Sequence, residues 1–205
     1  MIHIHKSWLN YKDLISECVQ INKHRMKKTY PLFLLGFMLM AFTFQVNAQD
    51  FQPLDKSPHD IAYYRKTNLM PPLVKVLYGR PQKSGREIFG NVVPYGKIWR
   101  VGANEATEVT FYEDVLFGSE KIKKGIYTLF AIPEATEWTI ILSSNLDTWG
   151  TYEYDPKQDV ARVKSKVKKA EELESFSIGF KEKGQTVEMV LGWDTTRVSV
   201  PITTN

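Results

Sequence analysis

Short stretches in which apolar and polar residues alternate recur after residue 48, and they constrain the fold more than any other feature. Side chains two positions apart lie on one face of a strand, and this spacing occurs over residues 61–65, 74–78 and 138–142. Gly, Pro and Asn residues separate the stretches, and no ten-residue helical pattern follows residue 48. The pattern predicts an all-β, single-domain antiparallel β-sandwich of about nine or ten strands, for which a jelly-roll order is one arrangement.

The other expected strands have the same character. The segment 126–132 is apolar on both faces, which is typical of a central strand that is buried on each side. Glycine-containing turns are expected at 118–119, 124–125 and 183–184, and a last turn is expected at Asp194-Thr195-Thr196. The remaining predicted strands cover residues 109–111, 160–168, 176–180, 187–191 and 198–200.

Residues 26–48 have the features of a leader for export. The segment begins with Met26-Lys27-Lys28, continues with an apolar run over 32–44 and ends in small residues at Ala48. This is the pattern of a secretory signal peptide that is cleaved after Ala48. An uncleaved membrane anchor is the alternative, although the apolar run is short for a helix that crosses a bilayer.

The leader divides the chain into four parts. We expect residues 1–25 to be a mis-assigned upstream start and residues 26–48 to be removed. Residues 49–58 are polar with two prolines, so we expect a flexible leader there, followed by the β-sandwich domain over 59–202. The mature protein is then periplasmic or extracellular and has no stable membrane span.

The basic character of the whole chain, with 27 Lys and Arg against 23 Asp and Glu, comes from its first part. Six of the basic and two of the acidic residues precede residue 49, so the remainder carries equal numbers of each. This balance gives no field that would attract a polyanion, and we predict no nucleic-acid partner. Cys18, the only cysteine, also precedes residue 49, so we expect no disulfide in the exported domain.

Only one histidine, His59, follows residue 48. Common zinc sites need several His or Cys ligands, and a Ser-His-Asp or Cys-His arrangement would need His59 as its base. Glycine loops of the nucleotide-binding kind are also missing from the sequence. We therefore predict no cofactor and no metal site of these kinds. Calcium takes carboxylate and carbonyl oxygens, and two loop pairs leave it open: Asp155 with Asp159, and Asn145 with Asp147.

Residues 93–105 resemble a strand least, and we call this segment the hub. Arg100 offers a planar fork for carboxylate, phosphate or sugar hydroxyls, and Asn104 both donates and accepts hydrogen bonds. Tyr95 and Trp99 present ring faces on which a sugar or a cation stacks. The alternative is a structural connector with Trp99 in the core. The candidate ligand-binding residues are Arg100, Asn104, Tyr95, Trp99, Arg80, Arg86, Glu105 and Trp149.

Three further features have two interpretations each. Trp149, Tyr152 and Tyr154 form either a sugar platform or part of the core, and the spacing predicts that both tyrosines lie on one face. The cations that alternate over 161–168 form either a docking strip or a solvated strand face. Acidic residues supply either a catalytic pair, as in glycosidases, or solvated charges; the candidates are Glu105, Glu108 and Asp147.

Several motifs in a fixed order resemble the family known as domain of unknown function 2911. They are YGRP at 78–81, GREIFG at 85–90, VPYGKIWRVGAN at 93–104, GIYTLFAIP at 125–133, EWTIIL at 137–142 and RVSVPI at 197–202. The resemblance extends over about residues 57–202 and implies an exported bacterial protein, without an assigned activity or catalytic residues. Gly79 departs from the family pattern, in which a serine is more usual at this position.

These observations favour a non-catalytic binding module for a saccharide or a small anionic ligand, with the hub as one wall of its pocket. The first alternative is a carboxylate-based glycan hydrolase. The second is a structural or interaction protein of the cell envelope. The identity of the ligand and the oligomeric state are left open by the sequence.

The leader generates the first testable prediction. The exported protein is expected to begin at Gln49, because the signal peptidase cleaves after Ala48. Intact-mass spectrometry of the protein recovered from the periplasm or the medium measures this. Recovery of a membrane-bound chain that retains residues 26–48 would instead establish the anchor.

Overall fold

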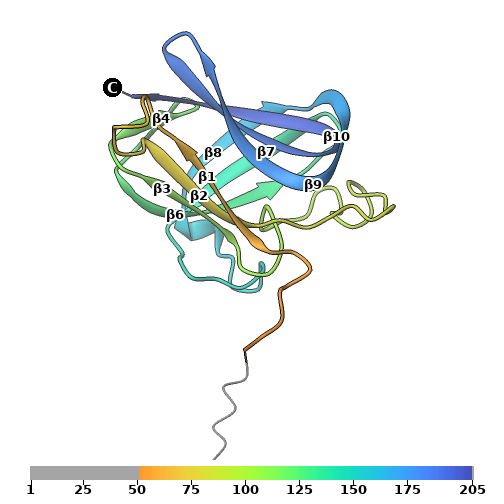
Figure 1. The fold of residues 1–205 in the computed structure, drawn as a ribbon. Helices are drawn as coiled ribbons and strands as arrows, with labels where there is room; N and C mark the ends of the chain where they lie inside the picture. Colours follow the sequence, from red (N-terminus) through yellow and green to blue (C-terminus); the bar gives the residue numbers. More distant parts are fainter. Residues whose placement is uncertain (1–50, 205) are drawn as a thin grey trace, which may run out of the picture. The chain divides into compact units, whose positions relative to one another are not determined.

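The computed structural model describes residues 51–204, and ten strands form their framework (Figure 1). The strands are β1 (His59–Tyr64), β2 (Val74–Gly79), β3 (Thr107–Phe111), β4 (Val115–Phe117), β5 (Glu120–Ile122), β6 (Gly125–Ile132), β7 (Glu137–Ser143), β8 (Asp159–Lys166), β9 (Lys168–Lys183) and β10 (Thr186–Thr204). One turn of 3-10 helix, η1 (Pro156–Gln158), precedes β8. No helix within this described part is long and apolar enough to cross a membrane. The predictions for residues 1–48 lie outside the described residues.

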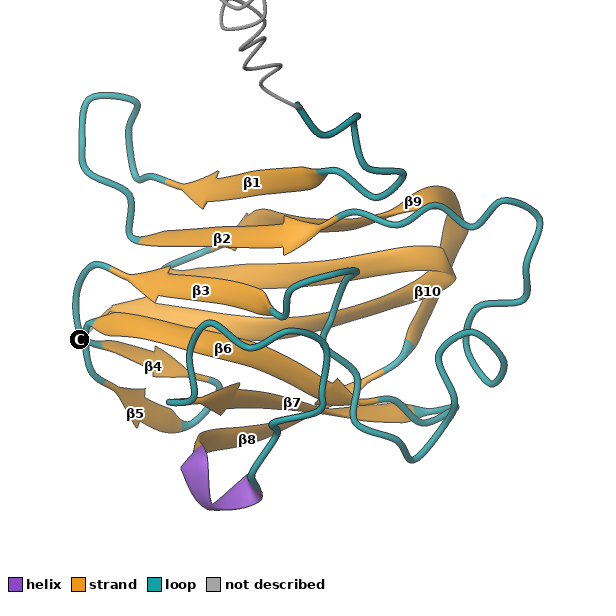
Figure 2. Cartoon of the chain, turned by 90° about the horizontal axis from the view of Figure 1, so that it is seen from below, coloured by secondary structure: helices purple, strands orange, loops and turns teal. Residues whose placement is uncertain are grey.

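Six strands form the first sheet, in the order β1-β2-β3-β6-β7-β8 (Figure 2). All neighbours in it are antiparallel. β6 lies between β3 and β7, and its residues 128–131 are all buried. Side chains from both faces of β6 are therefore removed from water, which confirms the central strand predicted from its apolar sequence.

The second sheet has four strands in the order β5-β4-β10-β9. The chain passes from the first sheet to the second after β3, returns after β5, and passes over again after β8. Apolar side chains of the two sheets meet in one core, for example Phe111 of β3 against Phe117 of β4 at 6.0 Å between ring centroids. The predicted antiparallel β-sandwich of nine or ten strands is confirmed.

One predicted turn is wrong. Asp194-Thr195-Thr196 lies inside β10, which continues as a strand from Thr186 to Thr204. Its register with β9 shifts between Gly192 and Asp194 and again between Asp194 and Thr196, and Asp194 has a φ of 50°. The polar residues and the positive φ are accommodated as β-bulges, because β10 stays paired with β9 on both sides of them.

The predicted strand 160–168 is in fact parts of two strands in different sheets. β8 ends at Lys166 and β9 begins at Lys168, so the cations do not form one continuous row. Arg162 forms an ion pair with Asp159 at 2.7 Å, and Lys164 forms one with Glu137 at 3.2 Å. These contacts favour the interpretation of β8 as a solvated, ion-paired edge.

Side chains connect the two sheets along their sides. The Tyr78 hydroxyl accepts a hydrogen bond from the Ile178 N–H at 3.1 Å and donates to Asp60 at 3.2 Å, and burial raises its pKa. Arg80 binds Asp60 at 3.0 Å and the Ser177 hydroxyl at 2.9 Å. Since Ile178 and Ser177 belong to β9, these bonds join β9 to β1 and to the end of β2.

The other side of the sandwich is joined by a pair of serines. The Ser165 hydroxyl in β8 donates to the Ser199 carbonyl at 2.8 Å and accepts from the Ser199 N–H at 3.1 Å. Ser165 is 7% exposed, so these bonds are shielded from water. Buried polar groups that are bonded in this way fix the position of one sheet on the other.

Candidate functional site

The hub lies beside β6 at the point where β3 begins, and it pairs with the part of β6 that β3 does not reach. β3 pairs with β6 only as far as Leu129. Beyond that point, Trp99 and Ala131 exchange two backbone hydrogen bonds of 2.8 and 2.9 Å, and the Gly96 N–H donates to the Pro133 carbonyl at 2.9 Å. A segment without regular secondary structure is thereby held against the sheet at its centre.

Trp99 anchors the hub in the core. It is 9% exposed, and its ring lies 5.2 Å from Phe176, 5.8 Å from Trp138, 6.1 Å from Phe89 and 6.3 Å from Trp193. Trp138 belongs to the first sheet, whereas Phe176 and Trp193 belong to the second. The structural interpretation of Trp99 is therefore correct for most of its ring.

Two glycines let the hub approach strand β2 closely. A Cβ atom on Gly79 would lie 2.0 Å from the Ala103 carbonyl oxygen, and one on Gly102 would lie 2.8 Å from the Gly79 oxygen. Both contacts are too short for any side chain. The neighbouring Val101 has a φ of 57°, and its carbonyl accepts a 2.6 Å bond from the buried Thr107 hydroxyl, which holds this conformation.

A cavity of about 400 Å³ opens beside the hub, and we call it the cationic cavity. Its lining includes Arg86, Lys97 and Arg100, together with Asn104 and Trp99, and contains no Asp or Glu among the described residues. None of the three cations forms an ion pair within residues 51–204. The cavity therefore concentrates positive charge, although residues 49–205 carry equal numbers of basic and acidic residues.

Arg100 contributes the most uncompensated group of this cavity. Its Nε is buried and has no hydrogen-bond partner in the described part of the chain. The guanidinium carbon lies 5.9 Å from the centre of the Trp149 ring, within the range of a cation–π contact. A buried donor without a partner is costly, so Arg100 is a polar group whose hydrogen bonds this part of the chain does not satisfy.

Asn104 closes the cavity toward the residues that precede β1. It has a φ of 61°, and its carbonyl accepts a bond from the Gly150 N–H at 3.2 Å. The pKa of Asp55 is lowered, first by the Ser57 N–H at 2.6 Å and then by the Asn104 side-chain amide. The Asn104 amide therefore favours the charged form of a nearby carboxylate.

The remaining predicted residues are spread around the cavity. Arg86 lines it, but Arg80 bonds to Asp60 and Ser177 and serves the sheet contact described above. Tyr95 is 42% exposed and contacts Gly90 rather than the cavity. Trp149 stands beside Arg100, and a β-bridge joins it to Glu105.

Glu105 lines a second cavity, of about 470 Å³, which we call the acidic cavity. His59, Glu108 and Asp147 share this lining. His59 Nε2 lies 3.1 Å from the Glu105 carboxylate, and Lys75 Nζ lies 3.6 Å from that of Glu108. No group of three His, Cys, Asp or Glu side chains that could hold a metal ion occurs among residues 51–204.

The aromatic segment after β7 divides in two. Trp149 and Tyr152 are exposed, and their rings stack with 5.7 Å between centroids and 2° between planes. Tyr154 instead packs against Phe130 at 5.0 Å and donates to Asp159 at 2.9 Å. The expectation that Tyr152 and Tyr154 share one face is wrong, because the segment forms turns rather than an extended strand.

A comparison with protein families identifies the family to which this chain belongs. A family model described as "Protein of unknown function (DUF2911)" matches residues 57–202. The chain belongs to the DUF2911 family. Comparison with curated proteins gave no match, and comparison with solved structures gave none either. In this DUF2911 protein, the hub and the lining of the cationic cavity lie within the matched region.

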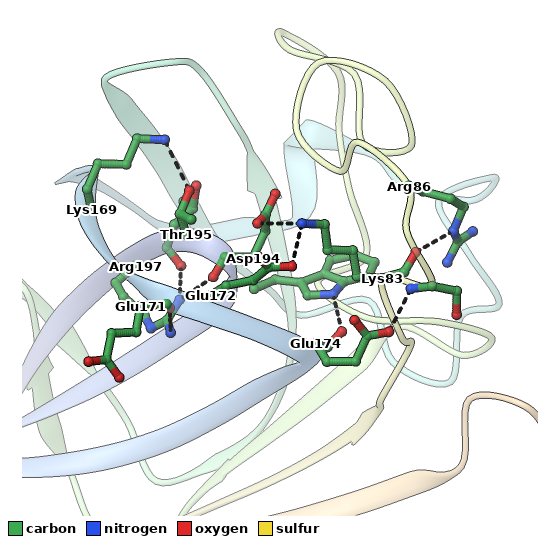
Figure 3. A network of polar contacts seen from close by, with 12 residues as sticks. Lys83, Arg86, Lys169, Glu171, Glu172, Glu174, Asp194, Thr195 and Arg197 are labelled. Atoms are coloured by element: carbon green, nitrogen blue, oxygen red, sulfur yellow. Dashed lines mark hydrogen bonds and ion pairs between the residues drawn. The ribbon is translucent and has the colours of Figure 1, made fainter.

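A polar network holds the loop that carries Arg86 (Figure 3). Lys83 Nζ lies 2.7 Å from Glu172 and 3.0 Å from Asp194, and the Lys83 N–H donates to the Glu174 carbonyl at 2.7 Å. The two carboxylates raise the pKa of Lys83, Glu172 the more strongly. Arg86 Nε in turn donates to the Lys83 carbonyl at 2.9 Å, so the network positions Arg86 beside the cationic cavity.

The bulge in β10 belongs to the same network. The Arg197 guanidinium donates to the Asp194 carbonyl at 2.9 Å, to the Thr196 carbonyl at 2.8 Å and to the Glu171 carbonyl at 2.7 Å. These bonds satisfy carbonyls around the register shifts between β10 and β9 (Figure 3). The irregular part of β10 thus presents the Asp194 carboxylate to Lys83.

Sequence reasoning missed Lys83 and Lys97 as site residues of this DUF2911 protein. Lys97 has a signal in the sequence, because it lies in the hub three residues before Arg100. Lys83 has none, since its partners Glu172 and Asp194 are 89 and 111 positions away in the chain.

The close approach of β2 and the hub yields a stability prediction. Gly79→Ser is expected to destabilise the protein by about 1–3 kcal/mol, because the new Cβ must displace the hub backbone. Each kcal/mol corresponds to a fall in Tm of about 2–4 °C for a domain of this size. Thermal unfolding followed by circular dichroism measures the change.

Gly179→Ser is the matched control. Gly179 also lies in a strand, but a Cβ atom there meets nothing within 4 Å. Its Tm is expected to stay close to that of the wild type. Equal Tm values for the two variants would contradict the close packing of the hub on Gly79.

The Lys83 network yields a prediction about local order. Lys83→Met is expected to speed backbone hydrogen exchange in residues 82–90, because the loop loses both carboxylate contacts. Lys123→Met is the control, since Lys123 forms an exposed pair with Asp114 elsewhere. Unchanged exchange in 82–90 of the Lys83 variant would show that the network does not hold this loop.

Proposed function

We propose that this protein is a non-catalytic binding module that takes a small anionic ligand or a saccharide into the cationic cavity beside the hub. The observation that carries the proposal is the charge of the lining, which has three cations and no carboxylate among the described residues. Surface cations usually have acidic neighbours that neutralise part of their charge. A concave site without such neighbours attracts anions.

The chemistry of Arg100 supports an anionic group on the ligand. Guanidinium presents its donors in a planar fork that matches a carboxylate or a phosphate. In this protein the side chain lines the cavity, and its buried Nε has no partner among the described residues. An oxyanion beside the guanidinium gains charge-assisted hydrogen bonds, and Arg100 forms no ion pair among the described residues that the oxyanion would have to replace. Lys97 adds another positive charge, and Asn104 adds a neutral donor.

We further propose that the module acts in the periplasm or outside the cell, as the leader at residues 26–48 indicates. A sandwich joined along both sides is a rigid carrier for a preformed site. A module that only binds its ligand needs no activated acid, base or nucleophile in the cavity.

The acidic cavity favours one alternative, a carboxylate-based glycan hydrolase. Glu105, Glu108 and Asp147 line a common cavity, and glycosidases use two carboxyl groups about 5–10 Å apart. However, His59 and Lys75 each lie within ion-pair distance of one of these groups, which favours structural charges. The second alternative, an interaction protein of the envelope, stays a prediction.

The proposal predicts that anions stabilise the protein through Arg100. Acetate and inorganic phosphate, at constant ionic strength, are expected to raise the Tm of the wild type by mass action. Arg100→Gln is expected to weaken this binding about tenfold or more, because charged hydrogen bonds are lost. Titration of the Tm against anion concentration gives the two dissociation constants.

The control separates the site from a general salt effect. Anions such as phosphate stabilise many proteins by exclusion from their surfaces. Arg65→Gln removes a cation that lies outside the cavity, where it bonds to the Met70 carbonyl, and this variant is expected to respond like the wild type. An identical response of the Arg100 and Arg65 variants would refute the anion site.

A further inference from the structure

Trp149 and Tyr152 form an open aromatic platform beside the cationic cavity. Their rings are parallel within 2° and 5.7 Å apart. Trp149 is 56% and Tyr152 is 82% exposed, whereas Trp138 and Trp193 in the core are each 2% exposed. A tyrosine that stacks on a neighbour and is still this exposed presents its other face to water.

The platform and the cavity are physically continuous. Arg100 lines the cavity, and its guanidinium carbon lies 5.9 Å from the centre of the Trp149 ring. Thr151, between the two aromatic residues, also lines the cavity. The Gly150 N–H bonds to the Asn104 carbonyl, and Trp149 bridges to Glu105. A ligand held by Arg100 therefore lies next to the platform.

The two features suit different parts of one molecule. The cationic lining suits an anionic group, and exposed ring faces suit the C–H face of a sugar, whose hydroxyls stay in water. Large aromatic side chains held open at the rim of a polar cavity are typical of binding surfaces. The charge of the lining does not explain why the two rings are exposed, and the exposed rings do not explain the charge of the lining.

We infer that the ligand is an acidic saccharide, with its anionic group at Arg100 and Lys97 and an adjoining sugar ring on Trp149 and Tyr152. This inference rests on the proposed anion site and names its ligand class. The platform is open to solvent on one side. The open ring face suits the C–H face of a sugar, and a nucleobase on the same platform is an outcome of the test below.

Three probes separate the two contributions. Galacturonic acid carries a ring and a carboxylate, galactose carries the ring alone, and acetate carries the carboxylate alone. Galacturonic acid is expected to bind about tenfold tighter than either single-feature probe, because both contacts then contribute to one dissociation constant. Isothermal titration calorimetry at constant ionic strength gives the three values. Galactose 6-phosphate tests the same ring with a phosphate, and tight binding of either acidic sugar supports the inference.

The variants assign each contact. Tyr152→Ala is expected to weaken the binding of galacturonic acid about fivefold and to leave the affinity for acetate unchanged, because only the sugar ring contacts the platform. Tyr112→Ala is the control, since Tyr112 is also exposed, at 45%, and does not line the cationic cavity. Lys97→Gln is expected to weaken the binding of galacturonic acid and of acetate and to leave the affinity for galactose unchanged.

The outcomes distinguish this inference from the anion site itself. If acetate and phosphate bind through Arg100 but neither galacturonic acid nor galactose 6-phosphate binds tighter than its anion alone, or if Tyr152→Ala does not weaken the tighter acidic sugar, the saccharide inference is wrong and the anion site stands. If AMP binds more tightly than both acidic sugars and loses this in Tyr152→Ala, the platform serves a base and the inference is overturned. If no anion binds the wild type, both proposals fail.

Discussion

The insertion of Trp99 between the two sheets is the contact on which the site depends. Its ring touches four other aromatic rings, contributed by both sheets and by the loop before the hub. Loss of such a side chain costs about 3–5 kcal/mol in a packed core, which is a large part of the stability of most domains. Because Trp99 is also bonded through its backbone to Ala131, the residues on each side of it are held in place without regular secondary structure. Lys97 and Arg100 owe their positions at the cavity to this anchor.

Local charge separation gives the folded part of this chain two distinct surfaces. The cationic cavity has no acidic lining residue among those described, and the acidic cavity has three. The hub supplies residues to both, since Arg100 and Asn104 line the first and Glu105 lines the second. Opposite charges on adjacent surfaces favour ligands of a defined sign and orientation. The equal numbers of basic and acidic residues over 49–205 therefore argue against a polyanion partner and say nothing against a local anion site.

The fold was predictable where the signal is local, and the errors occur where pairing with a distant strand decided the outcome. Alternation over 74–78 and 138–142, and the apolar run 126–132, correspond to β2, β7 and β6. Asp194-Thr195-Thr196 has the composition of a turn, but β9 pairs with β10 on both sides of it, so the chain bulges instead of turning. In the site, Arg100, Asn104 and Arg86 line the predicted concavity, whereas Arg80 and Tyr95 do not.

The sequence by itself determined the layered β architecture, the positions of several short strands such as β2, β6 and β7, and the irregular segment that lines the cavity, because side-chain periodicity and turn residues act over a few positions. Only the tertiary structure decided which side chains meet. It placed Lys83 between Glu172 and Asp194, stacked Tyr152 on Trp149 rather than beside Tyr154, and left Arg100 Nε without a partner among the described residues. These contacts join residues from separate parts of the fold, and the geometry of the two sheets, not the local sequence, brings such residues together.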